Sequence, residues 1–245
     1  MDKEQALTLL RAGYGDELRR AAYQFTAPLF WADPATPRPL FNNGSVFFLD
    51  CGDGPFAVTA DHVYAAYLAR KEQAPGLVCQ IGRLRFKPED RIIDRDQRLD
   101  VATFRIGEVE VERTAKWLHR PSSWPPVPPE EGRGVFLAGF ARTLRDEKEE
   151  AVTFGSVSLL LTATTIGNDT ITCQFDRENF VDMGSGLPPQ PMSLEGVSGA
   201  PLWTLVDRPV VGWRLAGVVI EYNTAFELLI VRRADCITAN GRLLR

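Results

Sequence analysis

Short apolar segments, arranged in two runs with a proline-rich stretch between them, are the feature that most constrains this fold. Residues 121–129 contain five prolines in nine positions, a composition typical of a linker, although it could also serve as a ligand for a polyproline-binding domain. Each run holds about six strand-sized segments bounded by turn residues. Because little helix separates these segments, a parallel α/β sheet is not expected. We expect an all-β protein with two antiparallel six-stranded β-barrels.

The apolar pattern also predicts where the elements lie. Residues 3–25 have helical spacing and are expected to form an N-terminal helical extension, broken at Gly13 and Gly15, that covers a barrel end or serves as a docking arm. Further helices are expected at 63–70 and 234–239. The expected strands are 45–51, 56–60, 77–81, 84–86, 91–94 and 101–106 in the first run, and 135–138, 151–161, 170–175, 200–206, 215–222 and 226–231 in the second.

These elements suggest four parts of the chain. Residues 1–40 would form the helical extension with its proline-containing connector, and residues 41–120 the first barrel lobe. Residues 121–133 would link the lobes, and residues 134–245 would form the second barrel lobe.

Composition excludes several classes of protein. The 245 residues are 44% hydrophobic and 24% charged, which is ordinary for a globular domain and unlike a disordered chain. The formal net charge of −4 predicts no general attraction to nucleic acid. The longest apolar stretches, at 135–140 and 215–220, are strand-sized, so no membrane helix is expected. Without a recognisable secretory signal, we expect a cytoplasmic protein.

Histidines and cysteines are too few and too scattered for a metal site. The chain has two histidines, and its four cysteines form no C-x-x-C pair, so we expect no metal ion. The cysteines could form two disulfides, but free buried thiols are the favoured interpretation for a chain without a signal. The cysteines are Cys51, Cys79, Cys173 and Cys236.

Three segments carry residues suited to nucleophilic catalysis. A strand-like segment ends at His62, Asp100 directly precedes an apolar strand, and Ser198 lies between glycines on a turn that enters a strand. A serine hydroxyl needs a base to remove its proton and a carboxylate to orient that base. The backbone N–H groups of Gly196 and Ser198 could point at one spot and bind an oxyanion there.

Over residues 40–240 the chain resembles the trypsin-like serine endopeptidases, which include bacterial HtrA-type proteases. The resemblance rests on T-A-D-H at 59–62, D-V-A-T at 100–103 and G-V-S-G-A-P at 196–201. The segments at 217–219 and 228–231 are similar to the family's closing strands.

The resemblance implies a cofactor-free endopeptidase with His62, Asp100 and Ser198 as its triad, acting on a protein or peptide. It also implies a substrate pocket that includes Met192, Ser193, Ile220 and Tyr222. Since Met192 is uncharged, we expect cleavage after small or medium uncharged residues rather than after Arg or Lys. No PDZ-type module is recognisable, and a stand-alone protease of this kind is expected to have a narrow substrate, latency or a regulatory partner.

Three residues depart from the family pattern. Asp61 replaces a small residue and could face outward or compete for the imidazole of His62. Val197 replaces the aspartate of zymogen-type members, which favours a non-zymogen protein. Ile220 replaces a serine that binds the triad aspartate, so the carboxylate of Asp100 would need another donor, such as a backbone N–H.

Alternatives remain open. Asp96 could replace Asp100 as the partner of His62, and His119, next to the proline-rich stretch, is expected at the surface. Because Asp61 and Ile220 are unusual, the chain could be an inactive pseudoprotease that binds peptides or partners. An esterase or acyltransferase could use the same three residues.

Overall fold

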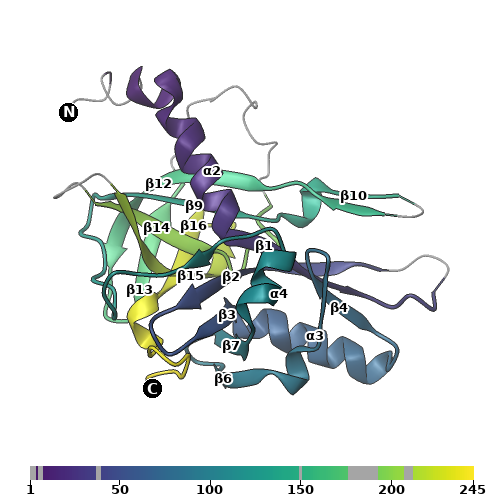
Figure 1. Ribbon diagram of the computed structural model, residues 1–245. Helices are drawn as coiled ribbons and strands as arrows, with labels where there is room; N and C mark the ends of the chain where they lie inside the picture. Colours follow the sequence, from purple (N-terminus) through teal and green to yellow (C-terminus); the bar gives the residue numbers. More distant parts are fainter. Residues whose placement is uncertain (1–3, 5–7, 37–39, 149–150, 176–192, 207–211) are drawn as a thin grey trace.

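The protein, described by a computed structural model at residues 4, 8–36, 40–148, 151–175, 193–206 and 212–245, is mostly β (Figure 1). It contains one closed six-stranded antiparallel barrel and one curled, open sheet. The prediction of two closed six-stranded barrels is therefore confirmed for one lobe only.

The first lobe is an eight-stranded sheet with the order β5-β4-β1-β2-β3-β7-β6, in which β8 pairs in parallel with β2. In the described residues its outer strands, β5 and β6, do not pair with each other, so the sheet stays open. The sequence pattern did not predict β1, which lies between β4 and β2 and comes from the stretch expected to be helix and connector. The strands are β1 (Thr26–Ala32), β2 (Asn42–Asp50), β3 (Pro55–Thr59), β4 (Val78–Ile81), β5 (Leu84–Phe86), β6 (Ile92–Asp96), β7 (Val101–Arg105) and β8 (Leu118–His119).

The second lobe is the closed barrel, with the strand order β12-β13-β16-β15-β14-β9. The stretch expected as one strand at 151–161 is two strands, separated at Gly155 and Ser156, where the N–H of Gly155 donates to the carbonyl of Leu144 at 2.9 Å. A hairpin of β10 (Arg145–Glu147) and β11 (Val152–Phe154) projects from the barrel. The barrel strands are β9 (Gly134–Gly139), β12 (Val157–Ile166), β13 (Thr170–Gln174), β14 (Pro201–Val206), β15 (Gly212–Asn223) and β16 (Leu228–Arg233).

An N-terminal helix covers the barrel, as the apolar spacing predicted. A π-helical turn, η1 (Leu10–Tyr14), leads into α2 (Gly15–Phe25). Gly13 breaks the helix with a φ of 110°, whereas Gly15, also expected to break it, has helical backbone angles and is the first residue of α2. The α2 helix contacts β9, β12 and β14 and lies across them in Figure 1. Its buried face includes Leu18 and Phe25, so the helix is part of the core.

Five more helical segments lie in the described chain, two of which, η2 (Pro88–Asp90) and η3 (Arg142–Leu144), are single 3₁₀ turns. The α3 helix (Asp61–Gln73) corresponds to the helix expected at 63–70, and η5 (Ala234–Cys236) lies where a terminal helix was expected. The α4 helix (Glu108–Arg113) was not expected; the carboxylate of Glu110 accepts a hydrogen bond from the backbone of Gly107 at its start. None of the described helices is long and apolar enough to span a membrane.

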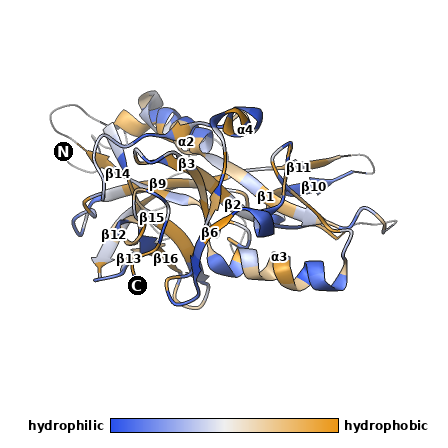
Figure 2. Ribbon diagram, turned by 60° about the horizontal axis from the view of Figure 1, so that its bottom comes forward, coloured by the Kyte–Doolittle hydropathy of each residue, from blue (hydrophilic) through white to orange (hydrophobic). Residues whose placement is uncertain are grey.

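One apolar cluster joins the two lobes. It contains Phe47 and Val58 from the open sheet, Phe136 and Trp203 from the barrel, and the inner face of α2. Figure 2 shows the hydrophobic residues concentrated along the strands of both lobes. Because both sheets contribute to this cluster, the loops at the seam between them are held in a defined relation.

The four cysteine side chains are free. Burial raises the pKa of the Cys173 thiol to about 12, and that of Cys236 to the same value. These thiols are therefore protonated and unreactive near neutral pH.

Candidate active site at the seam between the lobes

His62 and Asp100 form a close pair. The imidazole Nδ1 of His62 lies 2.7 Å from Oδ2 of Asp100, and the backbone N–H of His62 donates to Oδ1 of the same carboxylate at 2.8 Å. A carboxylate beside Nδ1 favours the tautomer in which Nδ1 carries the proton and Nε2 accepts one. The backbone donor that Asp100 was expected to need, given Ile220, is thus the N–H of His62.

Strand pairing explains why these two residues meet. The β3 strand ends at Thr59, which lies opposite Ala102 on the antiparallel strand β7. The residue just after β3 and the residue just before β7 are therefore neighbours, which brings His62, in the first turn of α3, next to Asp100. Asp96 does not contact His62; its Oδ1 accepts the N–H groups at positions 98 and 99.

Asp61 does not compete for the imidazole. Its buried carboxylate forms a bidentate pair with Arg95, at 2.7 Å from Nε and 2.9 Å from Nη2. The guanidinium also lies over the ring of Tyr64, 5.1 Å from its centroid. The unusual aspartate beside His62 is therefore a structural ion pair, with its charge directed to Arg95.

The Ser198 turn has a backbone that only glycines allow at two positions. Gly196 has a φ of 94° and Gly199 a φ of 88°. A side chain at Gly199 would collide with the carbonyl oxygen of Ser45 and the hydroxyl of Thr59. The turn is closed by hydrogen bonds from Val197 N–H to Leu194 and from Ala200 N–H to Val197, both at 2.9 Å.

Two N–H groups of this turn have no acceptor among the described residues. They belong to Gly196 and Ser198, whereas the N–H of the intervening Val197 is used within the turn. The carbonyl of Glu195 accepts the N–H of Arg142 at 2.7 Å, which fixes the peptide group that carries the Gly196 N–H. Unpaired N–H groups on a glycine turn are suited to binding a negatively charged oxygen.

Contacts between the lobes bring the Ser198 turn close to His62. The N–H of Ser45, on β2, donates to the carbonyl of Ser198 at 2.8 Å, and its hydroxyl donates to the carbonyl of Gly196 at 2.9 Å. Gly44 fits tightly between Val63, the residue after His62, and the carbonyl of Ser198. Within the described chain, no hydrogen bond joins the Ser198 hydroxyl to His62. Such bonds are often long in free enzymes and shorten when substrate binds.

A groove of about 760 Å³ opens beside this pair. His62, Asp100 and Ile220 are among its lining residues, together with Glu221 and Arg232. The side chain of His62 is half exposed, and the ring nitrogen that Asp100 occupies is Nδ1.

The predicted substrate-pocket residues that the structure describes lie in three places. Ile220 lines the groove, whereas Tyr222 does not and packs against Phe175 at 5.3 Å between ring centroids. Ser193 is exposed, and its hydroxyl accepts the N–H of Glu195 at 3.4 Å. Met192 lies outside the described residues.

His119 is not the surface residue that its neighbours suggested. Its ring is half-buried between Phe25 and Trp203, with centroids 5.6 Å and 4.8 Å away. Burial lowers the pKa of His119 to about 4, so its ring is neutral near pH 7. The expectation was wrong because β8, which holds His119 against β2, is only two residues long and gives no sequence pattern.

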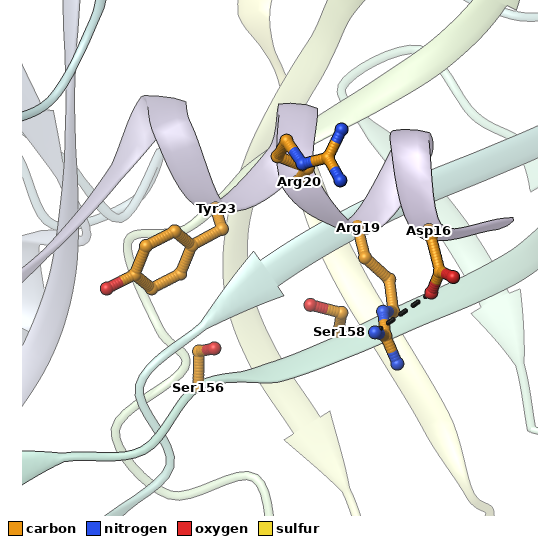
Figure 3. Close-up of a pocket in the computed structure, with 6 residues that line it drawn as sticks. All are labelled: Asp16, Arg19, Arg20, Tyr23, Ser156 and Ser158. Atoms are coloured by element: carbon orange, nitrogen blue, oxygen red, sulfur yellow. Dashed lines mark ion pairs between the residues drawn. The ribbon is translucent and has the colours of Figure 1, made fainter. Parts of the chain in front are cut away.

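No second chemical centre accompanies this site in the residues that the structure describes. No cluster of three or more histidine, cysteine, aspartate or glutamate side chains there could hold a metal ion. Another hollow, of about 580 Å³, lies between α2 and the start of β12 (Figure 3). It shares no residue with the groove, and its Arg19 is paired with Asp16 at 2.9 Å.

Comparison with known proteins finds a likeness to solved structures but none to a family model or a curated sequence. Among solved structures, the chain is similar to the active form of the Rv3671c protease from M. tuberculosis, with 15% identity and a TM-score of 0.46. That alignment covers 91% of this chain and 82% of the protease.

Proposed function

We propose that this protein is a serine endopeptidase with a trypsin-like arrangement of two β lobes. The observation that carries the proposal is that one carboxylate, that of Asp100, binds both the imidazole Nδ1 and the backbone N–H of His62. This pair lies at the seam where the Ser198 turn contacts the open sheet. The N–H groups of Gly196 and Ser198, which have no acceptor within the described part of the chain, are suited to the remaining requirement of acyl transfer, a site for an oxyanion.

In the proposed reaction, the hydroxyl oxygen of Ser198 attacks the carbonyl carbon of a peptide bond. Nε2 of His62 takes the hydroxyl proton, and Asp100 stabilises the resulting imidazolium through Nδ1. The carbonyl electron pair moves to oxygen, and the N–H groups of Gly196 and Ser198 bind that oxyanion.

Collapse of the tetrahedral intermediate breaks the carbon–nitrogen bond. The imidazolium of His62 gives its proton to the leaving amine, and the acyl group remains as an ester on Ser198. Water then attacks the ester with His62 again as base, which releases the acid and restores the hydroxyl. No metal or organic cofactor is needed for these steps.

The substrate class is a protein or peptide. Ile220 gives the groove an apolar element beside His62, which agrees with the expectation of an uncharged residue before the cleaved bond. Glu221 lines the same groove and would be solvated at its rim. It would therefore contribute only about 0–1 kcal/mol to the binding free energy of a basic substrate residue. A narrow substrate range and control by a partner remain predictions from the sequence.

The absence of a hydrogen bond between the described side chains of Ser198 and His62 favours a second candidate function. In this alternative the protein is a pseudoprotease that binds peptides on the intact scaffold. The former argument from Asp61 is weaker, because its charge is paired with Arg95.

Labelling with a fluorophosphonate probe tests the proposal. The probe reacts only with an activated serine, so we expect one label per chain, on Ser198. The variant Ser198→Ala should not be labelled, whereas Ser123→Ala, which replaces an exposed serine in the proline-rich stretch, should label like the wild type. Full labelling of Ser198→Ala, or no labelling of a folded wild type at any pH from 6 to 9, would contradict the proposal.

A further inference from the structure

Arg232, on the barrel strand β16, reaches the loop of the other lobe that carries Asp100. Its Nε donates to the carbonyl of Leu99 at 2.7 Å, and its Nη2 donates to the carbonyl of Arg98 at 3.1 Å. Its Nη1 donates to the carbonyl of Asp169 at 3.2 Å. One guanidinium therefore binds three backbone carbonyls, two of which belong to the residues directly before Asp100.

The backbone at Asp100 needs such support. Its φ of 55° lies in the left-handed region, which a residue with a side chain adopts only where the surroundings hold it. The carboxylate of Asp96 accepts the N–H groups of Arg98 and Leu99, at 2.8 and 2.9 Å. Since Arg232 binds the carbonyls of the same two residues, the peptide group between residues 98 and 99 is held on both sides, by Arg232 at its carbonyl and by Asp96 at its N–H.

Burying the guanidinium of Arg232 is unfavourable unless its hydrogen bonds to those carbonyls compensate for the lost contact with water. Its side chain is 10% exposed, and the nearest carboxylate described, that of Asp169, is 60% exposed and 4.0 Å away. A buried guanidinium without a close counter-charge is unfavourable. The hydrogen bonds to the loop, and not an ion pair, are therefore the main interactions of the planar guanidinium of Arg232.

We propose that Arg232 is a positioning residue for the reaction: it holds the Asp100 loop so that one carboxylate meets both Nδ1 and the backbone N–H of His62. This inference rests on the proposed function. Without Arg232 the carbonyls of residues 98 and 99 would lose their donors and the loop would relax. The imidazole would then lose its fixed tautomer and the charge that stabilises its protonated form.

The test compares Arg232→Gln with Arg233→Gln. Arg233 is the next residue on β16, but its guanidinium binds Asp235 and the carbonyl of Gly167, away from the Asp100 loop. In Arg232→Gln we expect the maximal labelling rate with the fluorophosphonate to fall on the order of 10²-fold, while the half-saturating probe concentration stays constant. Arg233→Gln should label like the wild type. The variant Arg232→Lys, which keeps the charge but not the fork, should fall between them.

A second readout needs no activity. The proton between Nδ1 of His62 and Asp100 should give a low-field NMR resonance in the free wild type and in Arg233→Gln, and this resonance should be lost in Arg232→Gln. If Arg232→Gln does not fold, Arg232→Lys is measured in the same way, with unfolding followed by circular dichroism.

The outcomes separate the two proposals. If the wild type takes no label but the resonance depends on Arg232, the positioning role stands and the protease function fails. A folded Arg232→Gln with wild-type labelling kinetics and an unchanged resonance would overturn the positioning role, whatever the protein does.

Discussion

The hydroxyl of Ser45, on the open sheet, donates a 2.9 Å hydrogen bond to the carbonyl of Gly196, on the barrel, and accepts the N–H of Phe140 at 3.1 Å. The same residue's N–H binds the carbonyl of Ser198. One side chain and one peptide group of the first lobe thus hold the turn that would bind the oxyanion.

Replacing Ser45 by alanine tests this hold. The variant leaves a buried carbonyl and a buried N–H unpaired, so we expect a loss of about 1–3 kcal/mol in the free energy of unfolding. The labelling rate should fall on the order of 10-fold, less than the 10²–10³-fold that follows loss of an oxyanion donor. Thr26→Val removes another buried hydroxyl, one bonded to Ala22, and should lower stability without changing the labelling rate. Equal labelling of Ser45→Ala and wild type would contradict the role.

Gly199 should tolerate no side chain. In Gly199→Ala the new carbon would combine a positive φ with collisions at Ser45 and Thr59, so we expect a loss of about 2–4 kcal/mol in the free energy of unfolding. Gly52→Ala is the matched control, because its φ of 111° carries the same kind of strain in open space. Urea unfolding of both variants measures the difference, and equal losses would show that the close approach at Gly199 has no cost.

Asp61→Asn should affect stability and leave the reaction intact. The change removes the charge that pairs with Arg95, and we expect a loss of about 1–3 kcal/mol in the free energy of unfolding. The labelling rate of the folded variant should equal that of the wild type, because the carboxylate of Asp61 binds Arg95 while the imidazole of His62 binds Asp100. A rise in that rate would instead mean that Asp61 competes for the imidazole.

His119 should make stability depend on pH. Burial lowers its pKa from 6.5 to about 4, so the unfolded chain binds a proton more readily than the folded one between these values. This contribution to stability is present above pH 6.5 and is lost as the pH falls from 6.5 toward 4. His119→Phe keeps an aromatic ring between Phe25 and Trp203 and should lose less stability over this range. If the free energy of unfolding falls by the same amount in the wild type and in His119→Phe between pH 7 and pH 4, the prediction is contradicted.

Cleavage should occur after small or medium uncharged residues. The basis is the uncharged Met192 of the sequence and the apolar Ile220 beside His62 in the groove. A peptide library varied at the residue before the cleaved bond, read as kcat/KM, measures the preference. A tenfold or greater preference for Arg over Ala or Val would contradict it. Glu221→Gln then tests whether a charge at the rim is responsible.

Local patterns account for most of what could be predicted. Short apolar segments bounded by turn residues predicted nearly every barrel strand to within a few residues. They failed for β1, β8 and β10. The β1 strand follows α2 directly, with no turn residue between them, and contains Pro28, whereas β8 and the charged β10 are too short for any pattern.

Residue identity determined which groups could react, and tertiary structure decided how they are arranged. His62, Asp100 and the glycines around Ser198 could be read from the chain, because the chemistry of a side chain and the tolerance for positive φ belong to single residues. The pairing of Asp61 with Arg95 and the reach of Arg232 across the seam could not. These contacts join residues 34 and 133 positions apart. The first depends on how α3 packs against the open sheet, and the second on how the two lobes pack on a shared core.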